Sequence, residues 1–273
     1  WYRDHGYSFL SITDHYILTD PAELDGIETE SFILIPGTEL AATPLGQQTH
    51  TCGLNISAQL DSRRGATPAE TMQMMADDIR EAGGIMQVNH PNWMWGLSVD
   101  DIRPVKGAAL LEVYNMGSGC NNEGDPANGR PPVEAIWDDL LTGGKVIWGV
   151  CSDDAHRYTE GQPDGPGKGW IVVKADRLTR EDVMNAIEKG DFYASTGVEL
   201  SDVLSTQEGI SLTSSPDSRG GFVTRFIGSG GKVLSEVEGL EPAYRFTGEE
   251  GYVRARVSAS DGSLALTQPV WVR

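Results

Sequence analysis

Cysteine, basic residues and long apolar runs are scarce in this sequence, and each shortage excludes a class of protein. Only 3 cysteines occur among 273 residues, without paired spacing, so a disulfide-built domain is excluded. The strictly apolar runs are as short as residues 32–35, so we expect no transmembrane helix. Lys and Arg number 21 against 40 Asp and Glu, and the net charge of −19 argues against binding to nucleic acid or to an anionic membrane.

The length and composition indicate a globular chain with one large core, or a large core and a small one. Cys52, Cys120 and Cys151 are expected to be small core residues. This cysteine usage slightly favours the cytoplasm as the location. Because the chain begins with Trp1 rather than Met, we expect further residues upstream. The acidic balance indicates solubility and a site for cations.

Residues 1–200 alternate between strand and helix patterns. Helices are predicted at about 68–82, 133–141 and 179–189, each ended by glycine. Strands are predicted at 9–13, 32–35, 50–56, 85–88, 109–114, 146–150 and 170–173. This order predicts an α/β fold with a mostly parallel sheet covered by helices, here a closed barrel.

Residues 201–273 lack helical periodicity and form short alternating runs between turn residues. The segment 252–257 places Val253, Ala255 and Val257 on one face and two arginines on the other. Glycine-rich residues 228–231 predict a hairpin turn rather than a phosphate loop, because no helix pattern follows. We therefore predict a second domain, a small antiparallel β-sandwich.

Residues able to bind metal are concentrated next to the predicted strands. Four of the five histidines lie there, together with several carboxylates, in four patches: 13–15, 37–39 with His50, 89–91 and 152–156. Imidazole and carboxylate ligands suit Zn, Mn or Fe. A single histidine after a strand is more often structural, but four such histidines make coincidence a poor explanation. The ends of barrel strands are also where catalytic residues gather.

Local geometry brings members of these patches together. Asp154 and His156 are expected to project to the same side of an extended backbone. Glu39 and His50 would face one cavity if the segment between them forms a hairpin. His90 follows a strand, whereas His5 is expected to be a surface residue. Several neighbouring ligand sets suggest two or three divalent ions that activate water for hydrolysis.

The order of these motifs resembles the PHP (polymerase and histidinol phosphatase) superfamily over nearly the whole chain. The residues concerned are Ile-Thr-Asp-His at 12–15, Gly-Thr-Glu at 37–39, His50, Asn-His-Pro at 89–91 and Ser-Asp-Asp-Ala-His at 152–156. Segments 148–156, 191–199 and 267–271 resemble its CehA/McbA-type metallohydrolases. The resemblance implies a distorted (β/α)7 barrel with two or three metal ions, commonly assigned as a phosphoesterase.

By the same resemblance Glu39 would bridge metal ions, and five other residues would complete the ligand set: His15, His50, His90, Asp154 and His156. Asp14 would be a ligand or contact one. The candidates for catalysis are Asp14, His15 and Asp154. One departure matters, because the family opens with a strand carrying His-x-His and this sequence has no such pair. We expect that the first strand and helix lie upstream; otherwise the chain is a degenerate member with fewer metal ions.

Substrate contacts are less defined by the sequence. Arg157 and Lys168 flank the 152–156 patch and could bind an anionic group, although ordinary surface charge explains them slightly better. Asn115 ends a strand and could line the mouth of the site. Trp93 and Trp95 could form a wall of a substrate pocket or merely pack at its rim.

We therefore predict an enzyme that acts on a small molecule, a metal-dependent hydrolase of phosphate esters. An ester, amide or carbamate hydrolase is the enzymatic alternative, because the sparse arginines leave phosphate without an evident partner. A barrel that binds metal or carbohydrate without catalysis is the third possibility.

Overall fold

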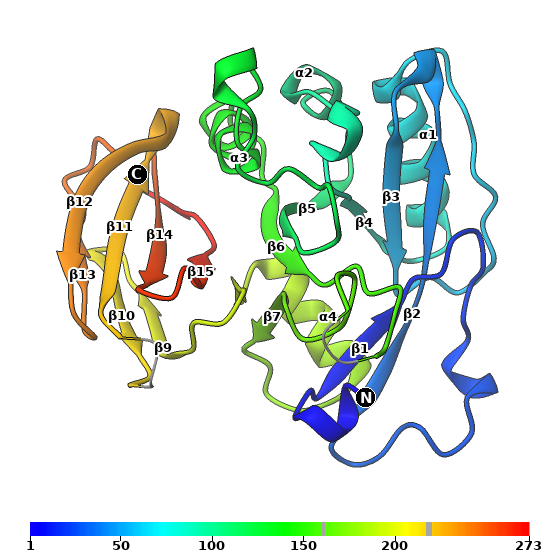
Figure 1. The fold of residues 1–273 in the computed structure, drawn as a ribbon, viewed down its shortest axis with the longest axis horizontal. Helices are drawn as coiled ribbons and strands as arrows, with labels where there is room; N and C mark the ends of the chain where they lie inside the picture. Colours follow the sequence, from blue (N-terminus) through cyan, green and yellow to red (C-terminus); the bar gives the residue numbers. More distant parts are fainter. Residues whose placement is uncertain (160–161, 217–219, 273) are drawn as a thin grey trace.

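The structure is a computed structural model, and it describes residues 1–159, 162–216 and 220–272. It is a mixed α/β protein with a curled, partly parallel sheet and two antiparallel sheets. In Figure 1 the curled sheet lies on the right, with α1 against its outer side, and the strands of the C-terminal region lie on the left. No helix in the described part of the chain has the length and apolarity needed to cross a membrane.

The curled sheet has the strand order β1-β2-β3-β4-β5-β6. Parallel ladders join β1 to β2, β4 to β5 and β5 to β6, whereas β2/β3 and β3/β4 are antiparallel. The strands are β1 (Phe9–Ile12), β2 (Ile33–Ala42), β3 (Thr49–Leu54), β4 (Ile85–Val88), β5 (Ala108–Asn115) and β6 (Trp148–Ser152). Because β1 and β6 are the end strands of this ladder, the sheet is an open half-barrel in the described residues, and closure into a (β/α)7 barrel stays a prediction.

Three amphipathic helices form where the sequence predicts them, and a short fourth, α2, precedes β5. Thr67 caps α1 by accepting from the Glu70 N–H, and Gly190 ends α4 in a left-handed conformation. The helices are α1 (Pro68–Glu81), α2 (Val99–Ile102), α3 (Val133–Thr142) and α4 (Arg180–Lys189). Met72, Met75 and Ile79 are fully buried and fix α1 to the sheet.

The strand at 170–173 is present but is placed differently from the prediction of a mostly parallel sheet. β7 (Trp170–Val173) pairs antiparallel with β8 (Phe192–Ser195), and β8 pairs with β15 (Leu264–Thr267). This larger sheet has the order β12-β11-β14-β15-β8-β7, with β16 beside β14. β7 therefore has an antiparallel partner, β8, where the prediction has a parallel neighbour. The division into domains at residue 200 remains a prediction, and hydrogen bonds cross it.

The remaining strands belong to two antiparallel sheets with a shared apolar core, and a separate sandwich domain stays a prediction. They are β9 (Leu200–Ser205), β10 (Gly209–Ser214), β11 (Phe222–Gly228), β12 (Lys232–Glu238), β13 (Ala243–Arg245), β14 (Tyr252–Ala259) and β16 (Val270–Trp271). Leu212 from the small sheet and Phe226 and Val257 from the large one belong to this core. The glycine-rich turn joins β11 to β12, as the sequence predicts.

An ion cluster joins the C-terminal strands to α3. Arg254 is 1% exposed, and its guanidinium donates to both carboxylate oxygens of Asp138, at 2.8 and 2.7 Å. Its Nη1 lies 3.0 Å from Glu134, and its plane lies over the Trp137 ring. Tyr252 also donates to Asp138. The arginine face of β14 is therefore buried against α3, and both faces of this strand are covered.

Glu250 supplies a test of how pH affects stability. Its carboxylate is 4% exposed and accepts from Tyr244, from the N–H and hydroxyl of Thr247, and from the Gly248 N–H. Burial acts to raise the pKa of Glu250, but these hydrogen bonds, chiefly those from Thr247, outweigh burial and lower the pKa to about 2.

A carboxylate with a lowered pKa in the folded protein stabilises it above the pKa of the unfolded chain, and this contribution is lost as pH falls. We expect Glu250→Gln to reduce the free energy of unfolding by about 1 kcal/mol at pH 7. The difference from wild type should shrink as pH falls from about 4.5 toward 2. Urea unfolding at several pH values measures it. Exposed Glu249→Gln is the control, and an equal effect of both variants would contradict the assignment.

Candidate metal centre

The β2–β3 hairpin places the first ligands of the site. Glu39 pairs with Cys52 and Ala41 with His50 across the antiparallel ladder. Since residues two apart share a face of a strand, Glu39 and His50 point to the same side. This confirms the hairpin expected between them.

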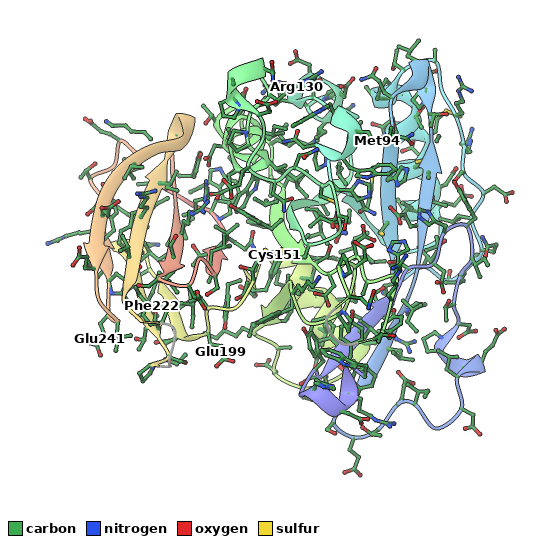
Figure 2. The ribbon with its side chains drawn as sticks, in the orientation of Figure 1. Met94, Arg130, Cys151, Glu199, Phe222 and Glu241 are labelled. Carbon is green, nitrogen blue, oxygen red and sulfur yellow. The ribbon has the colours of Figure 1, made fainter. Side chains whose placement is uncertain are left out.

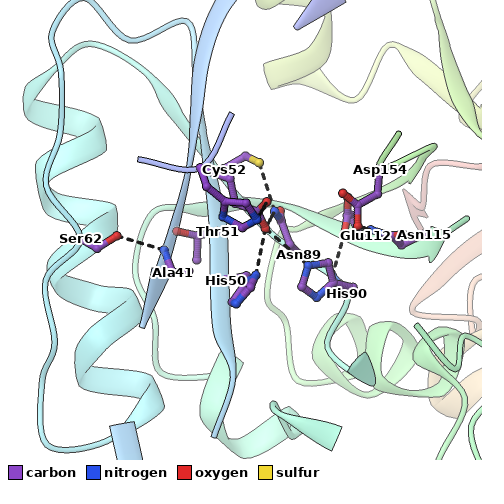
Figure 3. Close-up of polar contacts among 12 residues, drawn as sticks. Ala41, His50, Thr51, Cys52, Ser62, Asn89, His90, Glu112, Asn115 and Asp154 are labelled. Atoms are coloured by element: carbon purple, nitrogen blue, oxygen red, sulfur yellow. Dashed lines mark hydrogen bonds and ion pairs between the residues drawn. The ribbon is translucent and has the colours of Figure 1, made fainter. Parts of the chain in front are cut away.

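Three imidazoles surround the carboxylate of Glu39. Its Oε2 lies 3.3 Å from His15 Nε2, and its Oε1 lies 3.1 Å from His50 Nδ1 and 3.4 Å from His90 Nε2. The Asn89 amide donates to the same Oε1 at 2.9 Å. Ligand atoms of His15, Glu39 and His50 all lie within 4.8 Å of one another, so these three form a candidate metal-binding group. Figure 3 shows part of this cluster.

The electrostatics of this group favour a charged carboxylate. Burial acts to raise the pKa of Glu39, but the contacts with His50 and His90 hold it well below its ordinary value. Burial likewise acts to lower the pKa of His90, and Glu39 and Glu112 outweigh that effect and raise it. Burial raises the pKa of the Cys52 thiol, so a thiolate ligand is disfavoured. The donor set is thus imidazole and carboxylate, which suits Zn, Mn or Fe.

The 152–156 patch, at the end of β6, has a backbone geometry different from the extended one that was predicted. Asp154 has a φ of 50°, so residues 154–156 are not an extended segment, and alternation along a strand does not apply. The ring of His156 instead folds back, with Nδ1 3.5 Å from Asp154 Oδ1. The centroid of the His156 ring is 6.3 Å from that of the His15 ring, and His15 in turn contacts Glu39. The side chain of His156 is 58% exposed.

The neighbouring Asp153 has a structural role. It is buried and accepts from the Tyr2 hydroxyl at 2.9 Å and from the N–H groups of Gly167, Lys168 and Gly169 at 2.8, 2.5 and 2.7 Å. These contacts satisfy the carboxylate. Asp153 therefore fixes the segment leading into β7.

A large cavity opens beside the cluster. Its volume is about 1200 Å³, and His15, Glu39, Asp154 and His156 are among the residues that line it. Apolar residues of β1, β6 and β7 also line it. Space for a small-molecule substrate therefore adjoins the candidate ligands.

The residues predicted to bind substrate have unequal positions. Asn115 is 1% exposed and its amide donates to Asp154 Oδ2 at 3.3 Å, so it supports a candidate ligand. The Lys168 ammonium donates to the carbonyls of Gln162 and Pro163, so it is engaged within its own loop. Arg157 is exposed, beside the same loop. Within the described residues, neither Arg157 nor Lys168 forms a hydrogen bond to a member of the Glu39 cluster.

Asp14 and two tryptophans complete the surroundings. Asp14 is exposed and accepts from the Thr19 hydroxyl at 3.0 Å. The Trp93 ring lies 5.1 and 5.3 Å from the rings of His50 and His90, so it packs on the ligands themselves. Trp95 lies beneath Arg130, near exposed Met94, at the end of the molecule where α2 and α3 lie (Figure 2).

Sequence reasoning missed Glu112. This carboxylate is 3% exposed and lies between the ends of β4 and β6, where it contacts the backbone of His90 and the side chain of Asn115. Burial raises its pKa. The sequence did carry a signal, because Glu112 lies inside the apolar run 110–114. An acidic residue in a buried strand is rarely found without partners that bind its carboxylate.

Comparisons with known proteins give little further information. Neither a family model nor a curated protein sequence matches this chain. A crystal structure of a two-domain protein from Bacteroides vulgatus, which contains a predicted PHP-like metal-dependent phosphoesterase, is similar at 13% sequence identity. The similarity covers 97% of this chain and 87% of that one, with a TM-score of 0.42. A likeness this distant supports no conclusion about activity.

Proposed function

We propose that this protein is a metal-dependent hydrolase of phosphate esters. The observation that carries the proposal is the convergence of His15, His50 and His90 on one buried carboxylate, Glu39, which lines a cavity of about 1200 Å³. The order of these motifs along the chain, which resembles the PHP superfamily, supports the same assignment. Asp154 and His156 would complete a site for two or three divalent ions.

Divalent ions held here would supply Lewis-acid activation of water and stabilise charge on the reacting oxygens. Residues of the chain give the site its charge, orient its ligands and shield it from solvent. Glu39 carries a negative charge into a buried site, and its hydrogen bonds with the imidazoles fix their orientation. Trp93 shields one side of His50 and His90 from solvent. Asp14, His15 and Asp154 remain the candidates for contact with the reacting groups.

Hydrolysis of carboxylic esters, amides or carbamates is the second candidate. The observation in its favour is the engagement of the Lys168 ammonium with carbonyls of its own loop, which leaves a phosphate group without that partner. The surroundings are also acidic, since Asp14, Glu39 and Asp154 line the cavity. A neutral carbonyl substrate is repelled less by such walls than a phosphate dianion.

Metal dependence is the primary test. We expect the purified chain to bind Mn, Zn or Fe and to hydrolyse p-nitrophenyl phosphate or bis(p-nitrophenyl) phosphate faster than p-nitrophenyl acetate. Chelation should lower the rate by at least about 100-fold, and adding the ion back should restore it. Elemental analysis gives the number of ions per chain. The outer His5→Ala is a matched control for His50→Ala, because His5 is exposed and stacks on Trp1.

The possible results separate the candidates. Faster hydrolysis of the acetate ester would select the second candidate. Metal binding without hydrolysis of any of these esters would leave a binding site and refute the enzymatic proposal for this chain. Absence of bound metal, or equal binding by His50→Ala and wild type, would refute the site itself.

A further inference from the structure

Two candidate ligands have backbone conformations that residues with side chains rarely adopt. The φ angle is 23° at His90, just after β4, and 50° at Asp154, just after β6. Such a conformation is strained and persists only where the surrounding structure holds it. Contacts at the two strand ends must therefore stabilise these conformations.

Glu112 lies where such a group is needed. It belongs to β5, which pairs with β4 on one side and β6 on the other. One carboxylate oxygen, Oε2, accepts from the His90 N–H at 2.7 Å and from the Asn115 amide at 2.9 Å. The other, Oε1, accepts from Ser152 at 2.5 Å and from Gln87 at 3.2 Å. Four donors from three neighbouring strands and their ends thus meet on one buried side chain, and Figure 3 shows His90 and Asn115 beside Glu112.

The link continues to Asp154 through Asn115. The amide nitrogen that donates to Glu112 also lies 3.3 Å from Asp154 Oδ2. Packing there is tight, because a Cβ added at Gly117 would lie 3.0 Å from both Asn115 Oδ1 and Asp154 Oδ2. Ser152, at the end of β6, ties the start of the same turn to Glu112. The position of Asp154 is therefore set from both ends of this turn.

We propose that Glu112 is a positioning residue of the metal centre, which holds the strained strand ends that carry His90 and Asp154. This inference rests on the proposed metal site. A charged carboxylate suits this role because it accepts hydrogen bonds and donates none, and all of its neighbours named above are donors. Groups that orient metal ligands typically contribute a 10–100-fold change in metal affinity.

The chemistry of the contacts suggests a matched pair of variants. Glu112→Gln keeps an oxygen for the His90 N–H, while its amide can donate to the Ser152 hydroxyl, which is able to accept. Glu112→Leu has a similar size but no acceptor, so the backbone N–H of His90 loses its partner. Ser195→Ala is the control, because it removes a buried serine hydroxyl that donates to the carbonyls of Val198 and Leu264 and not to Glu112. Asn115→Ala cuts the link to Asp154 and leaves the contact between Glu112 and His90.

The readout is the dissociation constant for Mn or Zn, from calorimetric titration, with the Tm of each metal-free variant measured in parallel. We expect Glu112→Leu to bind metal about 10–100-fold more weakly and Asn115→Ala about 10-fold more weakly. Glu112→Gln should bind less than about 10-fold more weakly, and the control Ser195→Ala less than about 3-fold. If Glu112→Gln keeps most of the metal affinity that Glu112→Leu loses, Glu112 acts by positioning the ligands. A general loss of stability would not give that order of affinities.

Each outcome decides the inference. A folded Glu112→Leu with affinity within about 2-fold of wild type overturns it, as does Glu112→Gln as weak as Glu112→Leu. If Glu112→Leu does not fold, Asn115→Ala with unchanged affinity overturns it instead. Failure of the wild-type protein itself to bind metal would refute the proposed function, which is a distinguishable result.

Discussion

Replacing Glu39 by glutamine is expected to abolish metal binding at micromolar concentrations while the protein remains folded. The carboxylate lies within 3.4 Å of three imidazoles, and an amide has no charge and only one acceptor oxygen. Loss of a group that merely orients a ligand weakens binding by about 10–100-fold, so loss of the shared ligand should exceed about 100-fold. Calorimetric titration with Mn and Zn measures the effect.

A thermal measurement gives independent support. A ligand present at about 100 times its dissociation constant stabilises the folded state by about 2.7 kcal/mol. Wild type should therefore gain Tm on addition of metal, whereas Glu39→Gln should gain none. Glu81→Gln, an exposed change at the end of α1, should behave as wild type. A metal-induced rise in Tm of equal size in Glu39→Gln would show that the ion binds elsewhere.

Replacing Arg254 by methionine should produce the largest loss of stability. Arg254 is 1% exposed, and its removal leaves the buried carboxylate of Asp138 without its cation and leaves Glu134 with Arg256 alone. Breaking one partner of a buried ion pair costs about 3–5 kcal/mol. Urea unfolding at pH 7 measures the loss. The stacking of the guanidinium on Trp137 is lost as well.

Two further variants separate charge burial from lost packing. Asp138→Asn in the Arg254→Met background removes one uncompensated charge, so the double variant should be more stable than Arg254→Met alone. Arg225→Met breaks an exposed pair with Glu236 and should cost less than about 1 kcal/mol. A loss below about 1 kcal/mol in Arg254→Met would mean that the cluster contributes little.

The candidate ligands could be proposed from the sequence because four of the five histidines lie next to predicted strands, which separate structural roles explain poorly. The clustering of His15, Glu39, His50 and His90 follows from short-range rules about strand ends and hairpins. Glu112 was missed because its partners come from β4 and β6, and no short-range rule brings them together. The turn at Asp154 was misjudged for a related reason, since strain held by tertiary contacts leaves no local pattern.

Secondary structure followed the sequence closely where caps and glycines mark the ends of helices, as at Thr67 and Gly190. The pairing of strands into sheets could not be predicted in the same way. The pattern of β7 is that of any buried strand, and its partner β8 in turn pairs with β15 near the end of the chain. Arg254 and Arg256 gave the ordinary pattern of a strand with one polar face, which cannot reveal that α3 covers that face.

The pairing of β8 with β15 also constrains the order in which the protein can form during synthesis. The Ser195 hydroxyl donates to the carbonyl of Leu264, 69 residues further along the chain. While the ribosome makes the intervening strands, β8 has one edge without its final partner, and domains generally fold as units once their residues emerge. Closing so long a loop is slow compared with local pairing. The half-barrel strands β1–β6 can therefore pair early, whereas β7 and β8 gain their full support only after Thr267 has emerged.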